Sequence, residues 1–152
     1  MPTDAENNRI VIDTNVVISS GIGKGTPYKL FDEIIADAEF EICVSDAVLR
    51  EYNIVPLWDK FRKDKFLSKF PDFEVQIKYV LALIEINSTH FTPTQTITKV
   101  KDDADNRFLE LAVEAEALCI ITGNTKDFDF EEYEGIKIFS PRDFYEWWEE
   151  NQ

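Results

Sequence analysis

The stretch Ile10-Val11-Ile12-Asp13 decides how the rest of this chain is interpreted. Its three β-branched apolar residues predict a short buried strand, and Asp13 stands directly at the carboxyl end of that strand. Ligands of open α/β sheets bind outside the carboxyl ends of the strands. Asp13 is therefore a candidate ligand-binding residue, and the alternative is an ordinary polar residue in a surface turn.

Strand-like and helix-like stretches alternate along the chain. Short apolar runs predict further strands at residues 40–44, 89–92, 118–122 and 136–139. Caps, helical periodicity and prolines predict helices at residues 26–38, 45–55, 73–86, 102–117 and from 140 onward. This alternation is typical of an α/β sandwich around a mainly parallel sheet. Residues 59–72, which are rich in Lys, Asp and Phe, fit none of these elements, and a helical arm is one interpretation.

The chain has 152 residues, of which 44% are apolar and 30% are charged, as expected for one globular domain over residues 1–152. Sixteen Lys and Arg residues against thirty Asp and Glu residues give a net charge of −14. This charge excludes a uniformly basic nucleic-acid binder, though not a local basic strip, and it excludes electrostatic attachment to anionic membranes. No apolar stretch is long enough for a signal peptide or a membrane span, so we expect a soluble cytoplasmic protein. Cys43 and Cys119 both lie inside apolar runs, and we expect them to be buried reduced thiols.

Glu51 stands where a helical apolar stripe is expected. On a helix over residues 45–55, Val48, Tyr52 and Val55 share one arc, and Glu51 falls inside it. A glutamate on a buried stripe needs a cation beside it, because an unpaired buried carboxylate is costly. A metal ion and a neighbouring Lys or Arg are both open as that cation.

Asp105 repeats this pattern on the helix over residues 102–117. Its apolar stripe includes Phe108, Leu109 and Ala112, and Asp105 lies at the N-terminal end of the stripe. Acidic residues are also favoured at helix N-termini by the helix dipole, which is the alternative explanation. That alternative explains the preceding acids better than Asp105, because only Asp105 points along the stripe.

The strand at residues 118–122 is followed by Asn124 and Asp127. If the sheet is parallel, this loop and the three acids above meet at one edge. Several carboxylates together repel one another unless a divalent cation lies among them, and oxygen ligands suit Mg²⁺ or Mn²⁺. Such a metal lowers the pKa of a bound water and clamps phosphate oxygens, which favours metal-assisted phosphodiester hydrolysis.

Four segments, in this order and at fitting spacings, resemble the motifs of PIN-domain nucleases, specifically the toxins of bacterial toxin–antitoxin systems. They are Ile10-Val11-Ile12-Asp13-Thr14-Asn15, Ser45-Asp46-Ala47-Val48-Leu49-Arg50-Glu51-Tyr52, Asp102-Asp103-Ala104-Asp105-Asn106-Arg107-Phe108-Leu109 and Ile120-Ile121-Thr122-Gly123-Asn124. The resemblance covers nearly the whole chain. It implies a three-layer α/β/α fold with a mainly parallel central sheet, Mg²⁺- or Mn²⁺-dependent cleavage of single-stranded RNA, and frequent homodimers.

The resemblance also implies roles for individual acids. Asp13, Glu51 and Asp105 would bind the metal and orient the attacking water. Many PIN relatives have aspartate where this chain has Asn124, so the fourth acid is either Asp127, as added charge or a second-metal ligand, or absent.

Supporting residues follow from the same resemblance. Thr122 and Asn124 would position water or phosphate, and Thr14 and Asn15 would hold Asp13 by hydrogen bonds. A toxin of this kind is expected to have an antitoxin partner, whose Arg- or Lys-rich segment would reach the acidic edge of the sheet.

Other classes of protein remain as alternatives. A receiver domain or a haloacid-dehalogenase-like phosphatase also uses Mg²⁺, but the latter would have a second aspartate where this chain has Asn15. His90 is the chain's one histidine, which excludes a two-histidine zinc site. A catalytically silent RNA- or protein-binding module is the alternative outside enzymes. The net charge of −14 gives this alternative some weight against a ribonuclease, because repulsion weakens the approach of an RNA substrate.

Overall fold

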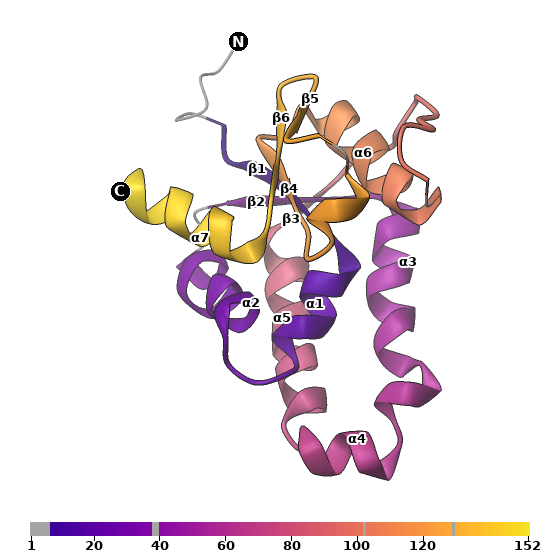
Figure 1. Cartoon of the computed structure of the whole chain (residues 1–152), viewed down its shortest axis with the longest axis vertical. Coiled ribbons are helices and arrows are strands. Elements are labelled where there is room, and N and C mark those ends of the chain that lie inside the picture. The colour runs from indigo at the N-terminus through magenta and orange to yellow at the C-terminus, as the bar shows by residue number, and fades with distance from the viewer. Residues whose placement is uncertain (1–6, 38–39, 102, 129) are drawn as a thin grey trace.

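A computed structural model of the chain describes residues 7–37, 40–101, 103–128 and 130–152 (Figure 1). Its centre is a six-stranded sheet in the order β3-β2-β1-β4-β6-β5. The strands are β1 (Arg9–Ile12), β2 (Glu41–Val44), β3 (Ser88–His90), β4 (Cys119–Ile121), β5 (Glu132–Tyr133) and β6 (Ile136–Phe139). Neighbouring strands are parallel except for β5 and β6, which are antiparallel. The predicted mainly parallel sheet is confirmed.

Helices cover both faces of this sheet. They are α1 (Thr14–Ser20), α2 (Thr26–Lys29), α3 (Asp46–Ile54), α4 (Asp64–Lys69), α5 (Phe73–Asn87), α6 (Asp103–Ala115) and α7 (Pro141–Glu150). In Figure 1, α6 lies on one side of the sheet, and α1, α2 and α5 lie on the other. Contacts of α6 with β1, β2 and β4, and of α5 with β2, close the two outer layers over the sheet. The three-layer α/β/α sandwich is therefore confirmed.

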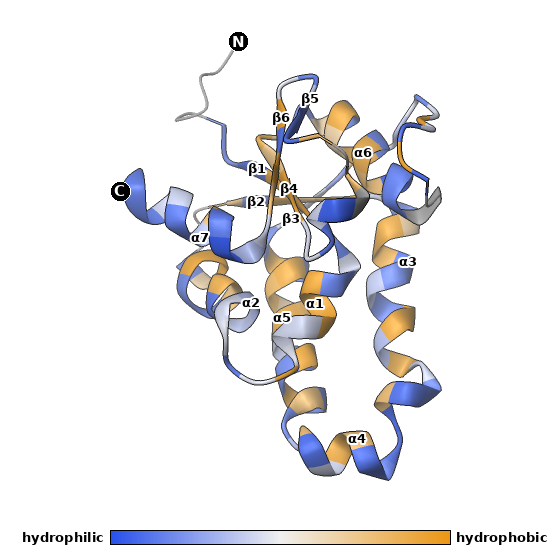
Figure 2. Cartoon of the chain, in the orientation of Figure 1, coloured by the Kyte–Doolittle hydropathy of each residue, from blue (hydrophilic) through white to orange (hydrophobic). Residues whose placement is uncertain are grey.

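The strands form the centre of the apolar core. Every residue of β4, and every residue of β1 except Arg9, is buried, as expected for parallel strands covered on both faces. Figure 2 shows the same pattern, with hydrophobic residues along β1 and β4 and a largely hydrophilic α7. Cys43 and Cys119 are free and buried within this core, and burial raises the pKa of the Cys43 thiol to about 12. The predicted burial of both cysteines, without a disulfide between them, is confirmed.

Most predicted elements form close to their predicted ends. Ser45 caps α3 by accepting a hydrogen bond from the Val48 amide at 3.2 Å, and Ser140 caps α7 in the same way. After α2 the chain continues helically through Leu30–Ile34 and Ile35–Asp37. Two predicted helix ends, Ala38 after this segment and Asp102 before α6, lie outside the described residues. None of the helices in the described part of the chain combines the length and apolar character needed to cross a bilayer.

Two elements form where none is predicted. They are the helix α1, which begins directly after Asp13, and the short strand β5. Residues 55–72 connect α3 to α5 through helical turns at Val55–Leu57 and Asp59–Phe61 and then α4, which agrees with the interpretation of residues 59–72 as a helical arm. Figure 1 shows this connection projecting away from the sheet, at the far ends of α3 and α5.

Candidate active site at the carboxyl edge of the sheet

The order of the strands creates a topological switch point between β1 and β4. From β1 the chain proceeds to β2 and β3 on one side, and then crosses through α6 to β4 on the other side of β1. In open α/β sheets the ligand site lies outside the carboxyl ends of the strands at such a switch point. Asp13 directly follows β1, and residues 122–124 directly follow β4. The sheet therefore brings both predicted segments to one place.

Asp13 is a buried carboxylate held by hydrogen bonds. Only 4% of the residue is exposed. Its Oδ2 accepts a hydrogen bond from the Thr122 hydroxyl at 2.8 Å and another from the Asn15 side-chain amide at 3.2 Å. The Asn15 backbone amide donates to Oδ1 at 3.4 Å, so Asp13 also caps α1. The alternative of an ordinary surface residue in a turn is wrong, because the carboxylate lies between two strand ends.

The loop after β4 fixes the groups that hold Asp13. The Asn124 amide donates to the Thr122 hydroxyl oxygen at 3.0 Å, which leaves the hydroxyl proton directed at Asp13. The Gly123 amide donates to Asn15 Oδ1 at 2.9 Å, which orients the Asn15 amide group toward Asp13. A Cβ at position 123 would lie 3.2 Å from that same Asn15 oxygen, so glycine allows the close approach. The predicted supporting residues Asn15, Thr122 and Asn124 thus lie around Asp13.

The predicted hydrogen bond from Thr14 to Asp13 comes from the backbone and not from the side chain. The Thr14 hydroxyl is buried and makes no hydrogen bond within the described part of the chain. Thr14 is the first residue of α1 and lies buried there, whereas its backbone amide interacts with Asp13. The support from Thr14 therefore comes from the main chain.

Burial raises the pKa of Asp13 from 3.8 to about 6. The hydrogen bond from Thr122 opposes this rise, and the negative charge of Glu51 adds to it. The carboxylate is therefore ionised at neutral pH at a cost in folding free energy, with a second carboxylate close enough to repel it. A cation between these two groups would remove that cost.

Glu51 reaches this region from α3. It is half-buried rather than buried, and Ile54, which is 48% exposed, shows that the apolar side of α3 is narrower than the sequence indicates. The neighbouring Tyr52 is fully buried and donates its hydroxyl hydrogen bond to the Ile12 carbonyl oxygen, next to Asp13. Tyr52 thus fastens α3 to the end of β1. Nothing in the sequence separates it from an ordinary core residue.

Asp105 lies in the first turns of α6 and is 7% exposed. The next residue, Asn106, is buried and pairs with Val100 in both directions, accepting from its amide at 2.8 Å and donating to its carbonyl at 2.7 Å. This pair fixes the start of α6, and α6 contacts α3. The predicted burial of Asp105 is confirmed.

The predicted acids are only partly gathered. Glu51 and Asp13 interact electrostatically. Among the described residues, no three His, Cys, Asp or Glu side chains form a group that could hold a metal ion. Asp127 ends a helical turn (Thr125–Asp127) after β4, and its side chain lies outside the described residues. The metal site stays a prediction, although the buried oxygen donors around Asp13 are of the kind that Mg²⁺ and Mn²⁺ prefer.

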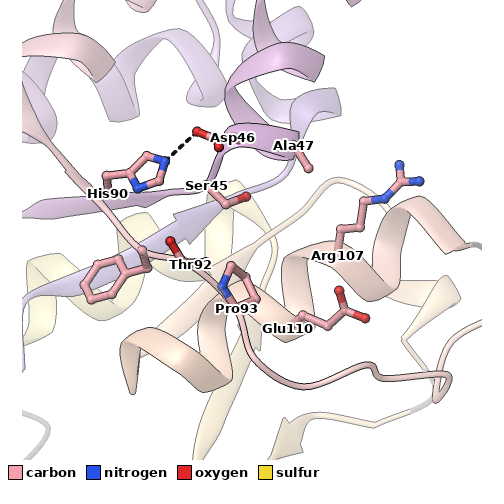
Figure 3. Close-up of a pocket in the computed structure, with 9 residues that line it drawn as sticks. Ser45, Asp46, Ala47, His90, Thr92, Pro93, Arg107 and Glu110 are labelled. Atoms are coloured by element: carbon pink, nitrogen blue, oxygen red, sulfur yellow. Dashed lines mark hydrogen bonds and ion pairs between the residues drawn. The ribbon is translucent and has the colours of Figure 1, made fainter.

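A pocket of about 250 Å³ opens beyond the ends of β2 and β3, between α3 and α6 (Figure 3). On one side of it, His90 Nε2 and Asp46 Oδ1 lie 2.7 Å apart. Arg107 and Glu110 of α6 lie on the other side. Asp13, Glu51 and Asp105 are not among the described residues that line it. The His90–Asp46 pair has no signal in the sequence, because the two residues are 44 positions apart.

The three-layer fold with a mainly parallel sheet is typical of a PIN-like α/β/α protein, and comparison with known proteins agrees. Residues 9–126 match the model of the PIN domain, and the chain belongs to that family. Uncharacterized protein MJ1680 of Methanocaldococcus jannaschii is 32% identical over 117 residues, which are 76% of this chain and 70% of that protein. PIN domains are generally nucleases. The matched region contains Asp13, Glu51, Asp105 and Asn124 and ends one residue before Asp127.

Proposed function

We propose that this protein is an Mg²⁺- or Mn²⁺-dependent endoribonuclease that cleaves phosphodiester bonds of single-stranded RNA. One observation carries the proposal beyond family membership: the buried Asp13 carboxylate at the switch point, whose pKa is raised to about 6 by burial with a further contribution from Glu51. A hydrogen-bonded anion at this cost in folding energy is typical of a functional site. The PIN family match favours this activity over the receiver and phosphatase alternatives.

Three acids would hold the metal in this proposal. Asp13 supplies a fixed carboxylate from β1, Glu51 a half-buried one from α3, and Asp105 a buried one from α6. Asp127 adds charge or a ligand from the loop after β4. A bound divalent cation supplies a water of lowered pKa and neutralises charge on the phosphate oxygens.

The other residues act through position. Thr122 and Asn15 hold the Asp13 carboxylate in one orientation through the hydrogen bonds described above. Asn124 is exposed in the loop after β4, where its side chain is available to water or phosphate. Deprotonated Asp13 is the form that binds a cation, so activity should fall below about pH 6.

The test is cleavage of a single-stranded RNA with Mg²⁺, with Mn²⁺ and with EDTA. The wild type should cleave only with the metal, and Asp13→Asn should not cleave. Asp37→Asn, which changes an exposed aspartate in the turn Ile35–Asp37, is the matched control and should cleave as the wild type does.

Metal binding has a second readout in thermal unfolding. A metal that binds only the folded state stabilises it by about 2.7 kcal/mol at a hundredfold excess over its Kd. Mn²⁺ should raise the Tm of the wild type and of Asp37→Asn, and should raise that of Asp13→Asn much less. Equal shifts in all three proteins would place the ion elsewhere on this acidic surface.

A catalytically silent RNA- or protein-binding module is the second candidate. The observation that favours it is the lack of any group of three potential metal ligands among the residues that the structure describes. It predicts RNA or protein binding that is unchanged by EDTA, with no cleavage under any metal condition.

The proposal extends to partners and location. A cytoplasmic toxin role would require an antitoxin whose Arg or Lys side chains reach the edge containing Asp13 and Glu51, replacing the charge of the metal. We also propose a homodimer. Co-purification with such a basic segment, and a twofold mass in solution, are the measurements that test these two points.

A further inference from the structure

The connection between α3 and α5 carries a charge opposite to that of the rest of the chain. Residues 60–69, called the basic tip below, contain five of the sixteen Lys and Arg residues and one of the thirty Asp and Glu residues. All five cations are exposed. They are Lys60, Arg62, Lys63, Lys65 and Lys69. The tip is a compact positive region on a protein of net charge −14.

These cations are available to a partner. The salt bridges found within the described part of the chain involve Arg9, His90 and Arg142, and none involves the basic tip. Lys60 Nζ lies 5.5 Å from the centre of the Trp58 ring and 5.0 Å from that of Phe61, so its charge lies over aromatic faces. The tip therefore presents positive charge that internal carboxylates do not neutralise.

A cluster of aromatic rings supports the tip from inside. Phe61 stacks on Phe73 with ring centres 5.4 Å apart, and Phe66 contacts both rings edge-on at 5.3 Å and 5.0 Å. Phe61 and Phe73 are buried. The cations thus stand on a packed scaffold, and next to them Trp58 is 50% exposed. An exposed tryptophan beside cations is the combination that binds single-stranded nucleic acid through base stacking and phosphate contacts.

We propose that the basic tip binds the phosphate backbone of single-stranded RNA, with Trp58 available to stack on a base. This inference rests on the proposed function and names the surface that captures its substrate. One continuous stretch of chain joins the two regions, because α3 carries Glu51 and is followed by the helical turns Val55–Leu57 and Asp59–Phe61, which lead into the tip (Figure 1). The tip therefore lies beyond the C-terminal end of the helix that supplies Glu51 to the candidate active site.

The charge distribution of the protein predicts that RNA binds first at the basic tip. The acidic surface repels RNA, so an approaching strand is attracted where the local charge is positive. Each phosphate that a cation neutralises on a single strand contributes about 0.7 to the slope of log Kd against log salt concentration. Binding through the tip therefore predicts a salt dependence that falls when its cations are removed.

The experiment measures binding of a fluorescein-labelled oligouridylate by anisotropy, in EDTA to prevent cleavage, over a series of NaCl concentrations. The test variant combines Arg62→Gln, Lys63→Gln and Lys65→Gln, whose exposed side chains leave the aromatic cluster intact. The matched control combines Lys24→Gln, Lys29→Gln and Arg142→Gln. Lys29 belongs to α2 and Arg142 to α7, which lie away from α3 and α4 in Figure 1, and Lys24 is an exposed residue of the loop before α2. Circular dichroism and Tm confirm that both variants are folded.

The test variant should lower the salt slope by about 2 and weaken binding at low salt by about tenfold or more, whereas the control should match the wild type. Equal losses in the two variants would overturn the proposal, since binding would then follow net charge alone. Unchanged RNA binding with a loss of self-association in the test variant would also overturn it, in favour of a contact between two copies of this chain. If the wild type cleaves RNA with metal but RNA binding does not depend on the tip cations, the tip proposal is rejected and the nuclease proposal stands. If binding depends on the tip cations but no metal-dependent cleavage occurs, the tip proposal stands and the nuclease proposal is rejected.

Discussion

The edge that contains Asp13 and the basic tip differ in charge, burial and origin. Asp13 is 4% exposed, and its carboxylate is fixed by groups from α1 and the loop after β4. The tip is one continuous segment, residues 60–69, whose cations are exposed and have no carboxylate partner in the described part of the chain. Chemistry on a phosphodiester requires fixed geometry, which distant segments supply only after folding. Capture of a flexible polyanion requires only positive charge at the surface.

This difference leads to opposite expectations for substitution. Changes at the edge should reduce the rate of the chemical step and alter folding energy, because the groups there are buried and interact. Changes at the tip should weaken RNA binding and leave folding energy nearly unchanged, because exposed charges contribute little to stability.

The largest expected effect is that of Asp13→Asn on cleavage. The substitution keeps the size of the side chain and removes its charge, so kcat should fall by about a thousandfold or more. RNA binding in EDTA should be unchanged or tighter, because one repelling charge is lost. Single-turnover cleavage and anisotropy measure the two quantities. A variant that binds weakly but cleaves bound RNA normally would reverse the roles assigned to the edge and the tip.

The next effect concerns Glu51. If it shares a metal with Asp13, the double variant Glu51→Gln, Asp13→Asn should be hardly slower than Asp13→Asn alone, since the first substitution already disables the site. Combining Asp13→Asn with the three tip substitutions should instead add a separate loss in binding. The coupling between two sites is obtained from cleavage rates of four proteins: the wild type, the two separate variants and the variant that combines them. Multiplicative losses from Asp13 and Glu51 would show that the two carboxylates act independently.

The sequence predicts the fold well where burial dominates. The strands β1 and β4 are apolar on both faces, and such runs are recognisable without tertiary information. The helix α1 is not recognisable in this way. Its sequence Thr-Asn-Val-Val-Ile-Ser-Ser has low helix propensity, and it forms because Asp13 caps it and Val16 and Val17 are buried.

The candidate site is likewise predictable only in part from the sequence. The position of Asp13 at a strand end is visible in the sequence, and so is the likeness of the segment after β4 to a PIN motif. The hydrogen bond between Thr122 and Asp13 joins residues 109 positions apart and depends on the pairing of β1 with β4, which the sequence does not specify. The charge of the basic tip is visible as composition, whereas its place at the end of α3 is a property of the fold alone.

The third prediction concerns stability against pH. The folded pKa of Asp13 is about 6 and the unfolded value is 3.8, so its contribution to stability is complete below about pH 4 and is lost as pH rises through 6. The loss amounts to about 3 kcal/mol for the metal-free protein. Urea unfolding at pH 4 and pH 7 should show this loss in the wild type relative to Asp13→Asn, with the tip variant following the wild type. An identical pH dependence in wild type and Asp13→Asn would contradict the raised pKa.

The smallest effect separates two threonines at the edge. Thr122→Val removes the hydroxyl that donates to Asp13 and accepts from the Asn124 amide, so it should cost about 1–2 kcal/mol of stability. Thr14→Val removes a buried hydroxyl that makes no hydrogen bond within the described residues, so it should be neutral or slightly stabilising. The Thr122 hydrogen bond lowers the pKa of Asp13, so its loss in Thr122→Val should raise that pKa and move the acid limb of the cleavage pH profile to higher pH. Thr14→Val should leave the profile unchanged. Urea unfolding and pH–rate profiles of the two variants test this pair. If both variants lose the same stability and keep the wild-type profile, the Thr122 hydroxyl fills space rather than holding the carboxylate, and Asp13 would depend on Asn15 and the start of α1 alone.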